Sequence, residues 1–152
     1  MVKAPGDDVA AVADVVCRFK AAGLLPEKNA IGVDAAGIGD IVDELTSPER
    51  GITLEQIVAV SQGWKLNAAI KTMERKVAGG EVEHCGSPLM AWCVGNAKVE
   101  ARGNAITITK QAAGSAKIDP LMASFNAGSL MALNPTASGA SVYESRGIRF
   151  VG

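Results

Sequence analysis

Two aspartates in this chain stand at positions where carboxylates can hold a divalent cation. Asp34 closes a short apolar run that is typical of a buried strand, and Asp119 stands where a helix is expected to begin, directly before Pro120. Oxygen ligands from two distant points of a chain suit a hard cation such as Mg²⁺. The pattern therefore predicts metal-dependent phosphodiester chemistry, with Asp34 and Asp119 as catalytic and metal-binding residues.

Two lysines close to Asp119 in the sequence are candidate DNA-binding residues. Lys110 ends a run of alternating apolar and polar residues, and Lys117 lies two residues before Asp119. Both could bind phosphate oxygens, although ordinary surface lysines are an alternative. Helix capping is likewise an alternative role for Asp34 and for Asp119.

The elements that position these residues alternate between helices and strands, which favours an α/β sheet with helices on its faces. In such sheets, polar groups beyond the carboxyl ends of strands usually form the site, and Asp34 occupies such a position. Hydrophobic spacing predicts strands over residues 30–34, 57–60 and 104–110, and helices over residues 8–22, 39–45, 64–77, 88–98 and 120–133.

Composition limits the function classes. The chain has 152 residues, which we interpret as a single domain over 1–152 with a loosely attached Ser/Gly/Ala-rich tail over 134–152. Its net charge of −1 provides no global basic field, so nucleic-acid contact requires a local patch. No run approaches the roughly 18 apolar residues that span a membrane. Three cysteines without a C-x-x-C pair favour reduced thiols in a cytoplasm. Trp64 and Trp92 are expected to be core or edge-packing residues rather than base-stacking platforms.

Several segments together resemble a known family. They are Asp34 after its strand, Val60-Ser61-Gln62-Gly63, the His84-x-Gly86-x-Pro88-x-x-x-Trp92-x-x-x-Asn96 run, Gly103-Asn104, Lys110, Lys117-Ile118-Asp119 and Tyr143-Glu144-Ser145-Arg146-Gly147. In this order, over nearly the whole chain, they resemble the C-terminal nuclease region of the large terminase subunits of tailed phages and prophages.

The resemblance implies a ribonuclease-H-like fold and an endonuclease that cuts concatemeric viral DNA during packaging. It also implies a carboxylate cluster that holds two Mg²⁺ or Mn²⁺ ions for in-line displacement. The implied partners are double-stranded viral DNA, the terminase small subunit and the portal protein, in the cytoplasm of a bacterial host.

The match is incomplete at the beginning of the chain. The family places its first metal-binding aspartate on an opening strand, whereas the first element expected here is a helix, so Asp34 and Asp119 resemble the second and third acids only. We therefore expect a partial ribonuclease-H-like fold that lacks its opening strands, and a fragment that is weakly active or inactive alone. The exposed edge of the Asp34 strand should be covered by the tail or by a second copy, giving a homodimer. Two alternatives are a catalytically dead interaction or assembly remnant, and a nucleotide-binding α/β module that uses residues 34–39.

Overall fold

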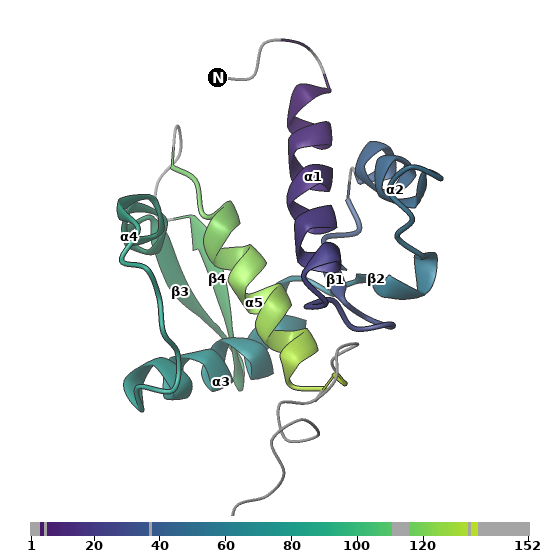
Figure 1. Cartoon of the computed structure of the whole chain (residues 1–152). Coiled ribbons are helices and arrows are strands. Elements are labelled where there is room, and N and C mark those ends of the chain that lie inside the picture. Colours follow the sequence, from purple (N-terminus) through teal and green to yellow (C-terminus); the bar gives the residue numbers. More distant parts are fainter. Residues whose placement is uncertain (1–3, 5, 37, 111–115, 134, 137–152) are drawn as a thin grey trace, which may run out of the picture. The chain divides into compact units, whose positions relative to one another are not determined.

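The computed structural model describes residues 4, 6–36, 38–110, 116–133 and 135–136 (Figure 1). Of these residues, 50% are helical and 14% lie in strands, so the chain is a mixed α/β protein, as the alternation predicted. Apart from residues 135–136, the predicted tail lies outside the described residues. In chain order the elements are α1 (Asp7–Ala21), β1 (Ile31–Val33), α2 (Gly39–Thr46), the 3-10 helix η1 (Leu54–Gln56), β2 (Ile57–Ala59), the 3-10 helix η2 (Gly63–Leu66), α3 (Asn67–Ala78), α4 (Pro88–Gly95), β3 (Ala97–Arg102), β4 (Ala105–Lys110) and α5 (Asp119–Met131).

The chain divides into two compact units. Unit 1 contains the described residues up to Ile31, then Ala36–Val58 and residues 135–136, and unit 2 contains Gly32–Ala35 and the described residues of Ala59–Asn134. Strands β1 and β2 pair with each other, as the sequence predicted. At the end of this pair, the Val60 N–H donates to the Val33 carbonyl over 2.8 Å, directly before Asp34.

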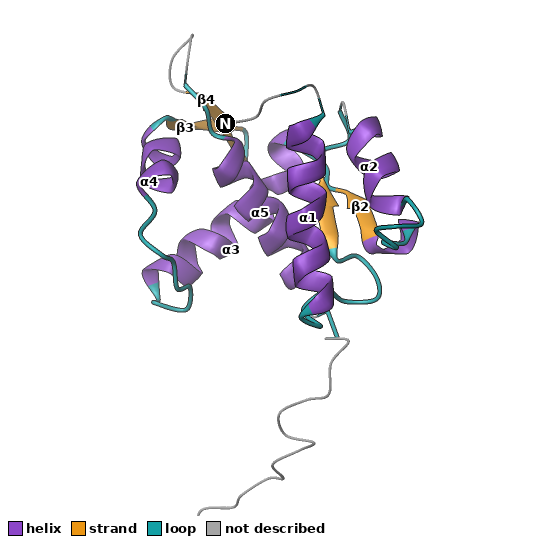
Figure 2. Cartoon of the chain, turned by 45° about the horizontal axis from the view of Figure 1, so that its top comes forward, coloured by secondary structure: helices purple, strands orange, loops and turns teal. Residues whose placement is uncertain are grey.

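Unit 1 is held together by the packing of α1 on α2 (Figure 2). Its core consists of Ala13, Leu45 and Ile52, with partly buried neighbours that include Val16 of α1. Helical spacing of the apolar residues does not by itself decide burial in α1, because Val12 and Phe19 are 49% and 50% exposed. The small Ala13 side chain is fully buried instead.

Unit 2 is built around α3, α5 and the β3–β4 hairpin. Its buried core consists of Leu66, Ile70 and Phe125, and Ile106 and Ile108 of β4 pack against it. The apolar residues of α3 and α5 recur at helical spacing, so each helix presents one stripe to this core. Pro88 and Pro120 lie in the first turns of α4 and α5, where proline fits, as predicted.

Strand β3 was not expected, since we predicted a helix through residue 98, whereas α4 ends at Gly95. The strand pairs with β4 in antiparallel register, with Ala97 opposite Lys110 and Arg102 opposite Ala105. Two sequence signals were present: strict alternation of small apolar and charged residues over 97–102, and a Gly-Asn turn after it. The φ of Gly103, +60°, is the left-handed conformation that glycine adopts without strain.

Candidate functional site

Asp34 is the residue that follows β1, and its side chain is exposed. The strand before it is anchored by Gly32, which lies against the second half of α5. A Cβ at position 32 would lie 3.1 Å from Leu130 Cδ1 and 3.5 Å from Asn126 Cβ. The absence of a side chain at Gly32 therefore allows the segment carrying Asp34 to approach α5 closely.

Asp119 is the first residue of α5 and is also exposed. Its alternative role as the helix cap does not hold: Ile118 is the N-cap residue and the helix has no side-chain capping hydrogen bond. Asp119 instead lies in the first turn, at the positive end of the helix dipole. Its carboxylate is thus not used as the helix cap.

Both aspartates belong to unit 2. Their positions can be compared along α5, because Asp119 begins this helix and the segment before Asp34 lies against it. Asn126, which Gly32 approaches, is seven residues from Asp119, or about 10 Å along the helix axis at the usual rise. Asp34 is two residues beyond Gly32, a reach of about 7 Å in an extended strand. Within the described residues no three His, Cys, Asp or Glu side chains gather into a group that could hold a metal ion. If Asp34 and Asp119 share an ion, two carboxylates fit one hard cation whose remaining ligands are water.

The two predicted DNA-binding lysines are exposed residues of unit 2. Lys110 ends β4, and Lys117 lies in the segment before α5. The Asn96 side-chain amide donates to the Lys117 carbonyl over 3.1 Å, which ties the end of α4 to that segment. This hydrogen bond holds the backbone of Lys117, which lies two residues before Asp119.

The sequence reasoning missed a partly buried pair of hydrogen-bonded amides. Asn126 is 6% exposed, and its side-chain oxygen accepts a hydrogen bond from Gln62 Nε2 at 3.1 Å. Gln62 also donates to the Val60 carbonyl, so it connects the segment after β2 to α5. The available signal was a polar residue, Asn126, at a core-facing position of an otherwise apolar helix stripe.

Charge is distributed unequally between the two units. Unit 2 carries eight Lys and Arg against six Asp and Glu, whereas the described residues of unit 1 carry four against nine. The slightly negative whole chain therefore includes a basic unit, and this unit holds Asp34, Asp119, Lys110 and Lys117. A local positive charge of this kind is what phosphate contacts require.

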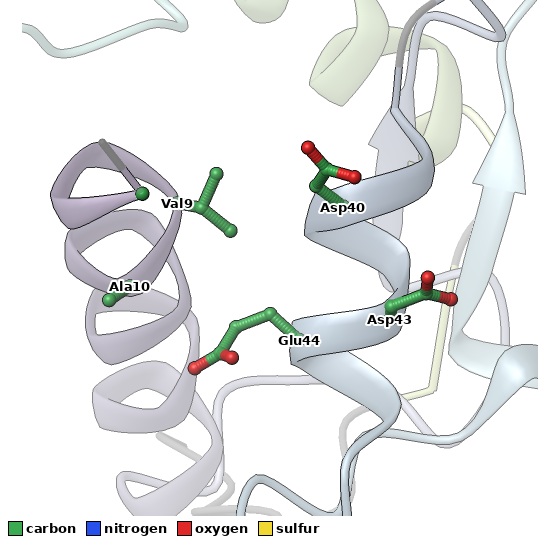
Figure 3. A pocket seen from close by; sticks show the side chains of 6 residues that line it. Val9, Ala10, Asp40, Asp43 and Glu44 are labelled. Carbon is green, nitrogen blue, oxygen red and sulfur yellow. The ribbon is translucent and has the colours of Figure 1, made fainter.

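A pocket of about 450 Å³ lies in unit 1 between α1 and α2. Figure 3 shows Val9 and Ala10 on α1, and Asp40, Asp43 and Glu44 on α2. Glu44 also accepts a hydrogen bond from Arg50, whose second partner is Asp14; these bonds to Asp14 and Glu44 raise the pKa of the Arg50 guanidinium. Because carboxylates line this pocket, it repels phosphate groups.

Trp64 does not pack in the core. Trp64 is 63% exposed and Trp92 is 47% exposed, so a place in the core is wrong for both. The Lys65 ammonium lies 5.9 Å from the centroid of the Trp64 ring, a cation–π contact.

No protein-family model, curated protein or solved structure matches this chain. No helix among the described residues is long and apolar enough to cross a membrane.

Proposed function

We propose that this chain is the nuclease region of a terminase-type large subunit, a metal-dependent endonuclease that acts on double-stranded viral DNA. Its fold would then be a partial ribonuclease-H-like one. By the same resemblance, its partners would be the terminase small subunit and the portal protein in a bacterial host.

The observation that carries this proposal is the convergence of separate motif segments on one helix. Gly32, before Asp34, contacts the second half of α5, and Gln62 of the Val-Ser-Gln-Gly segment hydrogen-bonds to Asn126 of the same helix. Asn96, which ends the His-x-Gly-x-Pro run, hydrogen-bonds to the Lys117 carbonyl just before that helix begins. Segments chosen by resemblance alone are thus neighbours around the helix that starts at Asp119.

In this function the chain's own residues would bind and orient the substrate. Asp34 and Asp119 would hold Mg²⁺ or Mn²⁺, and the bound ion would activate water and stabilise the leaving oxygen. Lys110 and Lys117 would contact phosphates beside the scissile one. Since two carboxylates leave most of the coordination to water, we expect weak metal binding and slow cleavage by this chain alone.

Calorimetric titration with Mn²⁺ tests the metal site. Weak binding should be lost in Asp34→Asn and in Asp119→Asn, because each removes one of only two charged ligands. Asp43→Asn, an exposed carboxylate of unit 1, is the matched control and should leave binding unchanged. Mn²⁺ binding that survives both site substitutions would place the ion elsewhere and overturn the assignment.

Plasmid nicking in Mn²⁺ tests the activity itself. We expect slow nicking that disappears in Asp119→Asn and persists in Asp43→Asn. If Asp119→Asn and Asp43→Asn nick the plasmid at the same rate, the activity does not depend on Asp119 and the proposed site is wrong.

A further inference from the structure

One exposed surface of unit 2 is not used by the proposed metal site. It is the basic stripe, formed by Trp64 and Lys65 of η2 together with Lys71 and Arg75 of α3, all of them exposed. Lys71 and Arg75 are four residues apart, so they lie one above the other on the same face of α3. Trp64 and Lys65 precede them in the 3-10 helix η2, which leads directly into α3.

The cations of this stripe differ from most others in having no acidic partner. Within the described part of the chain, Lys65, Lys71 and Arg75 make no salt bridge. By contrast, five other cations each lie within 4.0 Å of a carboxylate: Lys28, Arg50, Lys76, Lys98 and Arg102. The stripe carries three cations and lies beside one exposed carboxylate, Glu74, so it presents a net positive charge to solvent, which favours a polyanionic partner.

Trp64, the aromatic residue at the end of the stripe, indicates which kind of polyanion would bind. A tryptophan that is 63% exposed leaves a large apolar ring in water, and the ring lies beside the Lys65 ammonium. Single-stranded nucleic acids are bound by this combination of basic side chains along the backbone and an aromatic ring on which a base stacks. In a duplex the base faces are already stacked on one another and are not available to Trp64.

We propose that the basic stripe binds single-stranded DNA, with Lys65, Lys71 and Arg75 on consecutive phosphates and Trp64 stacked on a base. This surface needs neither a metal ion nor Asp34 and Asp119, so it goes beyond the proposed nuclease function. Its test is therefore carried out in EDTA, so that failure of the basic stripe and failure of the proposed metal site can be told apart.

Fluorescence anisotropy with a labelled 20-nucleotide oligo-dT measures the phosphate contacts. Loss of two contacts in the double variant Lys71→Ala, Arg75→Ala should reduce the slope of log K against log salt by about 1.4. We take the double variant and the unmodified chain to bind equally at about 1 M salt. The slope change then means that the double variant binds about tenfold more weakly at 0.2 M salt and about sixtyfold more weakly at 50 mM. The matched control is Lys98→Ala with Arg102→Ala, which removes one lysine and one arginine four residues apart in the sequence from β3 of unit 2 and should bind nearly as the unmodified chain does. Equal losses in the two double variants, or no binding of oligo-dT by the unmodified chain at 50 mM salt, would overturn the proposal.

Substitution of the two tryptophans separates the contribution of base stacking to the oligo-dT affinity from that of the basic side chains. Trp64→Ala should weaken oligo-dT binding by about tenfold, as expected for loss of one stacked base, and Trp64→Phe should restore most of it. Trp92→Ala is the control and should have no effect. In a Trp92→Phe background, oligo-dT should quench the emission of Trp64. The proposal would be overturned if the chain bound a labelled 20-base-pair duplex more tightly than oligo-dT and if Trp64→Ala left the duplex affinity unchanged. The surface would then not be a single-strand site.

Discussion

Replacing Gly32 with alanine would test how closely the segment before Asp34 packs on α5. The new Cβ would lie 3.0 Å from Val60 Cγ2 and 3.1 Å from Leu130 Cδ1. Non-bonded carbons are at their energy minimum at about 3.5–4.0 Å, so both side chains would have to move by a few tenths of an ångström. Val60 is β-branched and has little rotamer freedom, and Leu130 is only 9% exposed.

The size of the effect is a difference between two opposing contributions. Alanine is favoured over glycine within a strand by about 0.5–1 kcal/mol, whereas overpacking a well-packed core costs about 1–3 kcal/mol. We expect the free energy of unfolding of Gly32→Ala to fall by about 1–2 kcal/mol. With an m-value of about 2 kcal/mol/M, the urea midpoint would fall by about 0.5–1 M.

Urea unfolding followed by circular dichroism measures this change. The matched control is Gly95→Ala at the end of α4 in the same unit, because no heavy atom lies within 4 Å of its new Cβ. This control should leave stability unchanged or raise it by up to about 1 kcal/mol. The packing argument is refuted if Gly32→Ala is as stable as Gly95→Ala.

Three further substitutions test the structure of unit 2. Leu66→Ala empties a core position that is 2% exposed, and should lower the free energy of unfolding by about 2–5 kcal/mol; a loss below 1 kcal/mol would contradict its place in the core. Gly128→Ala should gain about 1 kcal/mol of helix propensity, provided that the Met73 methyl group, 2.8 Å from the new Cβ, moves aside; a lower melting temperature would mean that Met73 is held rigidly. Asn96→Ala removes the hydrogen bond to the Lys117 carbonyl, and should cost about 1 kcal/mol and speed amide hydrogen exchange in the first turn of α5; unchanged exchange there would show that the bond does not anchor this segment.

The sequence alone determined the features that depend on near neighbours in the chain. Proline in the first turn and apolar residues at helical spacing predicted α5, and the apolar runs before Asp34 and Val60 predicted β1 and β2. These signals are local, since capping, backbone dihedral limits and side-chain periodicity act within one or two turns. The position of Asp34 directly after a strand followed from the same local information.

Tertiary structure decided which side chains of each element are buried, because burial depends on neighbours that are distant in sequence. Periodicity predicted the helix over residues 8–22, but the packing on α2 buried Ala13 and left Phe19 half exposed. The exposure of Trp64 has the same origin, since no local pattern says whether another element covers a tryptophan. The Gln62–Asn126 hydrogen bond joins residues that are 64 positions apart, and only the packing of α5 in unit 2 brings these two amides together.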